Sequence, residues 1–192
     1  VANEGWNYGL GYCVKIQHDD GTSTVYGLPK CTGGFTNSFT YKNWDLSIFL
    51  QWSLGNDILN ANRMVFENPA KKKNTNMFAS YAGRWTPENS GSDMPRANAL
   101  GSNEYSSLYV EDGSFLKLKT ISLGYNFSAA MLKKAHISSA RVFVSAENIA
   151  TITGYSGSDP EVSTRNSVLT PGFDWSAYPR SFNASIGVNL TF

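Results

Sequence analysis

A strict alternation of apolar and polar residues closes the chain, and it constrains the fold more than any other feature. From residue 182 onward the even positions are Phe182, Ala184, Ile186, Val188, Leu190 and Phe192, and the odd positions between them are polar or glycine. Successive side chains of a β-strand point to opposite faces of the sheet. The pattern therefore predicts a strand with one apolar face and one polar face.

Five further segments alternate in the same way, which gives six predicted strands. We expect each strand to run about nine to twelve residues, which is longer than most strands of globular proteins and close to the roughly nine to eleven residues with which a tilted strand crosses a bilayer. In the fourth of the six, the alternation changes parity near Lys119 and Thr120, which predicts a β-bulge. The five segments are residues 10–16, 35–41, 44–54, 116–127 and 140–147.

The connections between these segments alternate in length. Residues 150–180, 55–114 and 18–31 form longer connections, whereas residues 128–139 and 42–43 form short ones. Outer-membrane barrels have short periplasmic turns and long extracellular loops. The sequence thus predicts an all-β fold, a transmembrane antiparallel β-barrel whose long loops lie outside the cell. We expect no strands in those loops.

The alternation assigns each strand a face toward lipid and a face toward a hydrated lumen. The polar row includes Asp45, Lys117, Lys119, Arg141 and Glu147, and a solvated interior accounts for each of these charges individually. The residues predicted to contact lipid are Trp44, Leu46, Ile48, Leu50, Trp52, Leu123, Tyr125, Val142 and Val144.

Composition excludes several other classes of protein. Only 16% of the 192 residues are charged and the net charge is +1, so the chain has no basic surface for nucleic acid. It has no apolar run long enough for a transmembrane helix. The first residues lack the pattern of a signal peptide, and we expect the chain to begin within a longer protein.

The sequence offers no catalytic or metal-binding set, so we expect neither an enzyme nor a cofactor. Cys13 and His18 supply two ligands where a structural zinc site needs four. If residues 17 and 32 pair, Cys13 and Cys31 lie about 16 Å apart, too far for a disulfide. The acidic loop residues lack the spacing of an EF-hand calcium site. They are Asp57, Asp112, Asp159, Glu161 and Asp174.

Several motifs, in their order and spacing, resemble the C-terminal barrel of the SusC/RagA family of TonB-linked outer-membrane transporters of Bacteroidetes. The resemblance covers about residues 25–192. The motifs are GGFTNSFTYKNWDLSIF (33–49), DGSFLKLK (112–119), LGYN (123–126), ENI (147–149), YSGSDPE (155–161), PGFD (171–174) and YPR (178–180).

The resemblance implies that residues 1–192 are the C-terminal part of a single barrel, about six strands of a 22-stranded one. The plug domain and the segment that contacts TonB would then precede this chain. It further implies TonB-dependent import of oligomeric nutrients, glycan or peptide, across the bacterial outer membrane. The implied partners are a SusD-like surface lipoprotein, the TonB complex, outer-membrane lipid and the barrel assembly machinery.

Two groups of residues follow as candidate interaction sites. The last strand resembles the signal that the barrel assembly machinery recognises. An edge strand can pair with a strand of another protein before the barrel closes. The apolar positions of this strand are Phe182, Ile186, Val188, Leu190 and Phe192. The loop from 55 to 114 resembles loops that contact the lipoprotein partner, with Trp85, Met94 and Arg96 as candidates, although a solvated loop is an equal reading. The basic run 71–73 is expected to be a surface feature.

Two alternative functions stay open on the sequence alone. A SusC-like barrel could serve as a structural subunit of an envelope complex, and a soluble all-β module could bind carbohydrate. The presence of a plug domain upstream separates the transporter from the structural barrel, and partition into the aqueous phase without detergent favours the soluble module. The sequence specifies neither the substrate nor the partner.

Overall fold

The computed structural model describes residues 14–17, 23–26, 28–68, 76–97, 106–133, 136–162 and 172–192. The chain divides into two compact units that alternate along the sequence. We call residues 29–55, 114–154 and 179–192 the sheet unit, and residues 1–28, 56–113 and 155–178 the loop unit. Strands dominate the described residues, which confirms the predicted β class.

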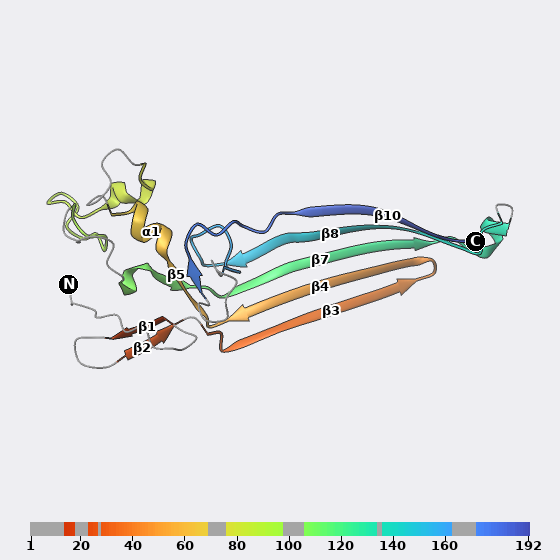
Figure 1. Ribbon diagram of the computed structural model, residues 1–192, viewed down its shortest axis with the longest axis horizontal. Helices are drawn as coiled ribbons and strands as arrows, with labels where there is room; N and C mark the ends of the chain where they lie inside the picture. The colour runs from red at the N-terminus through yellow and green to blue at the C-terminus, as the bar shows by residue number, and fades with distance from the viewer. Residues whose placement is uncertain are drawn as a thin grey trace. The chain divides into compact units, whose positions relative to one another are not determined.

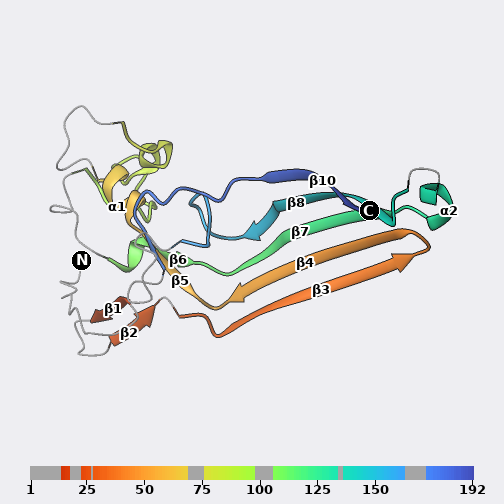
Figure 2. The ribbon, with the colours of Figure 1, turned by 45° about the vertical axis from the view of Figure 1, so that its right-hand side comes forward.

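The sheet unit is a five-stranded meander in which each strand is antiparallel to the next (Figure 1). Figure 2 shows the same five strands side by side from a second direction. Five of the six predicted strands are therefore confirmed, and they pair in the predicted order. They are β3 (Cys31–Tyr41), β4 (Trp44–Leu54), β7 (Phe115–Asn126), β8 (Ser139–Thr153) and β10 (Asn183–Thr191).

The short connections lie together at one end of this sheet. Residues 42–43 join β3 to β4, and residues 127–138, which include the short helix α2 (Ala129–Leu132), join β7 to β8. Tyr41 pairs with Trp44, which pairs with Tyr125, so both connections leave the sheet at the same level. This arrangement agrees with the predicted alternation of short and long connections.

Pairing between strands aligns like residues in rows across the sheet. One row consists of Phe39, Leu46, Leu123, Val144 and Ile186, one residue from each strand. The next row consists of Ser38, Ser47, Ser122, Ser145 and Ser185, and the Ser145 and Ser185 hydroxyl oxygens are 2.7 Å apart. Because neighbouring rows face opposite sides, the sheet has an apolar face and a polar face.

A bulge in β7 keeps the apolar residues on one face. Thr120 pairs with Phe49 and Leu118 pairs with Leu50, so Lys119 is an extra residue relative to β4. Without it, everything in β7 before residue 119 would point to the opposite face. The predicted bulge near Lys119 is confirmed.

A second irregularity lies at the same level in β8. Thr120 pairs with Glu147 and Leu118 pairs with Ala150, which leaves one more residue in β8 than in β7 between the two pairs. Asn148 has a φ of 53°, and its amide donates a hydrogen bond to the Ser181 carbonyl, 2.9 Å away. The pairing of β10 with β8 ends beside it, at Glu147.

The loop unit contains a small sheet that alternation did not reveal. Strands β5 (Asp57–Asn60), β6 (Val110–Asp112) and β9 (Phe173–Asp174) pair in the order β6-β5-β9, with β5 parallel to β9. The expectation of strandless loops is therefore wrong. The reason is length, since strands of two to four residues are too short to display a period of two.

A short helix and two 3₁₀ turns complete the loop unit. Helix α1 (Ala61–Phe66) follows β5 directly, and the side chain of Asn60 accepts a hydrogen bond from the Arg63 N–H at its start. The 3₁₀ turns are η1 (Ala79–Gly83) and η2 (Ser107–Tyr109). The buried core consists of Leu59, Ala61, Met64 and Tyr109, against which Leu108, Val110 and Phe173 pack.

The predicted first strand does not join the five-stranded sheet. Its described part belongs to β1 (Val14–Gln17), which pairs with β2 (Ser23–Tyr26) as a separate two-stranded sheet. The assumed pairing of residue 17 with residue 32 is therefore wrong, because Gln17 pairs with Ser23. Cys31 is exposed with a free thiol, and Cys13 and His18 lie outside the described residues. No helix among the described residues is long and apolar enough to span a membrane.

Candidate functional site

The apolar face of the sheet carries all nine residues that the sequence predicts to contact lipid. Strand pairing aligns Trp44 with Tyr125 and Val142, and Leu46 with Leu123 and Val144. Trp44, Leu123 and Val144 are exposed, with 47% of Val144 accessible, and the other six are partly exposed. Contiguous exposed apolar surface marks a contact with protein or membrane. Contact of this face with lipid stays a prediction.

The terminal strand exposes its large apolar residues. Ile186 is 78% exposed and Phe192 is 84% exposed. Phe182 and Phe192 directly flank β10, and among the described strands β10 pairs with β8 alone. This open edge agrees with the geometry expected of an assembly signal, whose recognition stays a prediction.

An ion pair crosses the polar face between two strands that are not neighbours. Arg141 on β8 binds the carboxylate of Asp45 on β4, with Nε 3.2 Å from Oδ1 and a second bond from Nη2 to Oδ2. The Asn126 amide donates to the same Oδ1 at 3.0 Å. The pair passes over Gly124 of the intervening strand, where a Cβ would lie 2.5 Å from Arg141 Nη2 and 2.6 Å from both Asp45 oxygens.

The other charges predicted on the polar row have separate surroundings. Lys119 donates a hydrogen bond to the side-chain oxygen of Gln51. Lys117 is only 2% exposed, with its ammonium 5.8 Å from the centre of the Phe115 ring. Glu147 is exposed at the level of the bulges. The structure thus brings Asp45 and Arg141 together in one ion pair.

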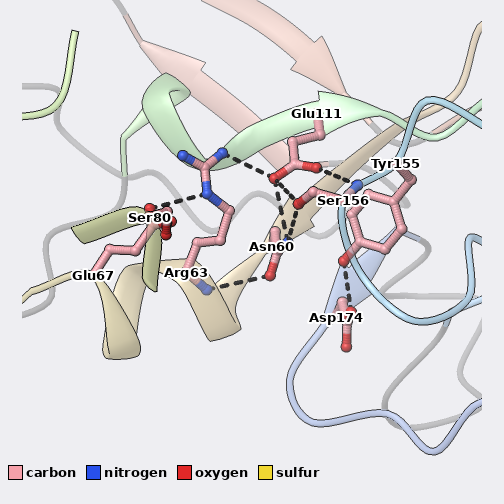
Figure 3. A network of polar contacts seen from close by, with 8 residues as sticks. All are labelled: Asn60, Arg63, Glu67, Ser80, Glu111, Tyr155, Ser156 and Asp174. Carbon is pink, nitrogen blue, oxygen red and sulfur yellow. Dashed lines mark hydrogen bonds and ion pairs between the residues drawn. The ribbon is translucent and has the colours of Figure 1, made fainter. Parts of the chain in front are cut away.

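A polar cluster in the loop unit joins parts of two long connections (Figure 3). We call Asn60, Arg63, Glu111 and Ser156 the Glu111 cluster. Oε1 of Glu111 accepts hydrogen bonds from Arg63 Nη1 and the Ser156 hydroxyl, both at 2.9 Å, and from the Asn60 amide at 3.2 Å. Oε2 accepts the Ser156 backbone N–H at 2.9 Å.

These contacts shift the pKa values of the charged groups. Burial alone would raise the pKa of Glu111, but hydrogen bonds from Ser156 and Arg63 favour the carboxylate and lower the pKa below its usual value. Burial opposes charge on Arg63 too, yet Glu111 and Glu67 raise its pKa. Arg63 Nε is 3.0 Å from Glu67, whose other oxygen accepts the Ser80 hydroxyl at 2.6 Å. The Glu111 carboxylate is therefore anionic at neutral pH.

A buried tyrosine and a buried aspartate pair within the second connection. The Tyr155 hydroxyl donates to Oδ2 of Asp174 at 2.6 Å, and Oδ1 accepts the Ala177 N–H at 3.2 Å. Burial raises the pKa of Tyr155, and the bond to Asp174 raises it further. The Tyr155 ring lies so close to Gly157 that a Cβ there would meet it at 2.3 Å. In the described part of the chain no group of three His, Cys, Asp or Glu residues could hold a metal ion.

The predicted partner-contact residues lie in an ordered turn. Trp85 N donates to the Met94 carbonyl at 2.9 Å, so the structure brings these two residues together. The side chains of Asn89 and Ser92 bond the Gly83 carbonyl at 2.9 and 2.7 Å and close the turn. Trp85 is 37% exposed and Arg96 is exposed. The basic run 71–73 lies outside the described residues.

No pattern in the sequence marks the Glu111 cluster as a site. Tyr155, Ser156 and Asp174 lie in the motifs at 155–161 and 171–174, which marked them only as part of a resemblance. Arg63 and Glu111 are 48 residues apart and carry no local pattern. A contact of this kind has no signature in one sequence, because the fold alone brings the partners together.

The chain is similar in sequence to several known proteins. No family model matches it. It is 36% identical over 169 residues to TonB-dependent receptor P3 of Formosa agariphila, covering 85% of this chain and 16% of that protein. It is 33% identical to TonB-dependent receptor P26 of the same organism, over 92% of this chain and 18% of that protein. The match to TonB-dependent receptor SusC of Bacteroides thetaiotaomicron is 28% identical over 91% of this chain and 16% of that protein.

Solved structures share the fold over the whole chain. The structure of the RagAB peptide importer in the open-open state matches with a TM-score of 0.75 and 23% identity, covering all of this chain and 22% of that one. A structure of the RagAB peptide transporter matches with a TM-score of 0.76 and 22% identity, again over 22% of its chain.

The curated relatives confirm the resemblance drawn from the motifs, and they are receptors rather than enzymes. The chain spans less than a fifth of their length. The chain is homologous to the SusC-like TonB-dependent receptors and corresponds to a short segment of them.

Proposed function

We propose that the chain forms the C-terminal wall of a TonB-dependent outer-membrane importer. One observation carries the proposal: strand pairing aligns mainly apolar residues on one face of the sheet and mainly polar residues on the other, across all five strands. A soluble sheet would cover such an apolar face with a second layer, whereas a barrel exposes it to lipid. On this proposal the sheet is part of a 22-stranded barrel and the loop unit is extracellular.

The proposed cargo is an oligomeric nutrient, either a glycan or a peptide. Relatives and fold neighbours support this class, since RagAB is a peptide importer and the curated relatives are TonB-dependent receptors. A plug domain and a TonB-contacting segment elsewhere in the protein would supply gating and energy. The polar face of the sheet, with its serine row and the Asp45–Arg141 pair, would line the lumen.

The proposed surface partner is a SusD-like lipoprotein. The turn that holds Trp85 beside Met94 supports this, because an exposed tryptophan on an ordered backbone is a suitable anchor for a protein interface. Arg96 follows two residues later and is exposed. The open edge of β10 supports recognition by the barrel assembly machinery during insertion.

Uptake measurements in the native bacterium test the import function. Deleting the gene should abolish uptake of one class of oligomeric nutrient, glycan or peptide, while its monomers still enter the cell. Inactivating TonB should have the same effect. Normal uptake of all oligomers by the deletion strain, with loss of an envelope complex, would instead identify a structural barrel. Recovery of the full-length protein in the aqueous phase without detergent would favour the soluble carbohydrate-binding alternative.

A further inference from the structure

We infer that the described parts of the two long connections move as one body that the Glu111 cluster holds together. These parts are residues 56–68, 76–97 and 106–113 of the first connection and residues 155–162 and 172–178 of the second. They emerge from different pairs of strands in the sheet unit, and the proposed function does not require them to be coupled. Glu111 lies in the first connection and Ser156 in the second, 45 residues apart. A displacement of either connection therefore displaces the other. The inference concerns contacts within the loop unit alone.

Glu111 is the centre of this coupling because its carboxylate bonds both connections at once. Arg63 and Asn60 reach it from the first connection. Ser156 reaches it from the second with two donors, the backbone N–H and the hydroxyl, one on each oxygen. Hydrogen bonds to a charged group are about twice as strong as neutral ones. The side chain is 13% exposed, so water competes little for it.

A second attachment holds the far end of the described part of the second connection. Strand β9 pairs with β5, and Leu59 N donates to the Gly172 carbonyl at 2.7 Å. Ser176 N donates to the Asn62 side chain at 2.8 Å. Phe173 packs on the core of the first connection. The second connection is thus fixed to the first both near residue 156 and at residues 172–176.

Tyr155 links these two attachments to each other. Its hydroxyl bonds Asp174, which lies on β9, while its neighbour Ser156 bonds Glu111. Release of Ser156 from Glu111 is therefore transmitted through Tyr155 to β9. This explains why the motif at 155–161 places a serine directly after a buried tyrosine and a glycine directly beneath its ring.

Hydrogen exchange measured by mass spectrometry on the full-length protein in detergent tests the coupling. In Glu111→Gln, the four donors from Asn60, Arg63 and Ser156 face one carbonyl oxygen and one NH₂ group. At least one of them must then point toward the NH₂ group, which is itself a donor. We expect exchange to rise about tenfold or more, and to a similar extent, in peptides covering residues 57–66 and 172–178. Ser156→Ala should give a smaller rise in the same two regions. The matched control is Glu88→Gln at an exposed position of the loop unit, which should change neither.

A rise confined to residues 155–157, or to one connection only, would overturn the inference, as would no change in either variant. Membrane yield and heat-modifiable mobility on gels establish that each variant is folded. If Glu111→Gln does not reach the membrane, Ser156→Ala carries the same test, because it removes a single hydroxyl.

Discussion

Arg141 on β8 reaches over Gly124 on β7 to bind Asp45 on β4, so that one ion pair spans three strands. The pair links two strands that are not neighbours in the sheet. It depends on the glycine, because any side chain at position 124 would occupy the space between the two charges.

The Gly124→Ala variant should therefore lose stability. Its Cβ would overlap the ends of both side chains, which would move aside and break the ion pair, and loss of a partly exposed pair of this kind costs up to about 1 kcal/mol. The matched control is Gly154→Ala in the same unit, where a Cβ meets nothing within 4 Å. Urea unfolding of the full-length protein in detergent should show a lower midpoint for Gly124→Ala only. Equal midpoints for the two variants would contradict the account of the crossing pair.

Removal of the Tyr155 hydroxyl should destabilise the loop unit. Tyr155→Phe leaves one oxygen of Asp174, a residue only 3% exposed, without its partner, and an unsatisfied buried acceptor costs about 1–3 kcal/mol. Tyr178→Phe is the control, since Tyr178 is 91% exposed. Limited proteolysis within residues 155–178 measures the difference. Cleavage of both variants at the wild-type rate would show that the hydroxyl contributes nothing.

Acid should weaken the Glu111 cluster in a defined window. The folded-state pKa of Glu111 is lowered from 4.5, so the carboxylate stabilises the loop unit fully above that value and loses its contribution as the pH falls through the lowered pKa. Glu111→Gln has no such group. The difference in loop-unit exchange between wild type and Glu111→Gln, corrected for intrinsic rates, should be constant above about pH 5 and shrink below about pH 4. A difference that persists unchanged into acid would contradict the assigned pKa direction.

Deletion of Lys119 should be far more damaging than its substitution. Loss of the bulge residue turns Leu116 and Leu118 toward the polar face and Lys117 toward the apolar face. If the apolar face meets lipid, a lysine on that face costs up to about 2–4 kcal/mol, with the largest cost at the bilayer midplane. Lys119→Ser keeps the residue count and removes the bond to Gln51. Outer-membrane yield should fall sharply for the deletion and little for Lys119→Ser, and equal yields would be inconsistent with the bulge setting the face.

The two bulges show what alternation in a sequence can and cannot predict. One extra residue in β7 changes the parity of the pattern, which made the bulge at Lys119 predictable. Relative to β4, strand β8 holds two extra residues at the same level, and an even insertion leaves parity unchanged. Alternation therefore could not reveal the two extra residues in β8. The predicted strand ended at residue 147, although β8 continues to Thr153.

The candidate sites also differ in whether the sequence could predict them. Faces of the sheet were predictable because they repeat over many residues of one strand. The crossing ion pair and the Glu111 cluster were not, since Asp45 and Arg141 are 96 residues apart and meet only when β7 lies between them. The separate β1–β2 pair was missed for another reason: it is a local hairpin, and the prediction assumed that each strand pairs with the next long one.

The whole functional proposal depends on the assignment of the apolar face to lipid. Measurement of spin-label accessibility tests this assignment most directly. Nitroxides would be placed singly at Leu46, Leu123, Val144 and Ile186, and at their polar neighbours Ser47, Ser122, Ser145 and Ser185, in the full-length protein reconstituted in bilayers. We predict that labels in the first row collide preferentially with oxygen, which concentrates in lipid, and labels in the serine row with a water-soluble nickel complex. Equal accessibility of the two rows, or nickel contact at the apolar row, would contradict the barrel.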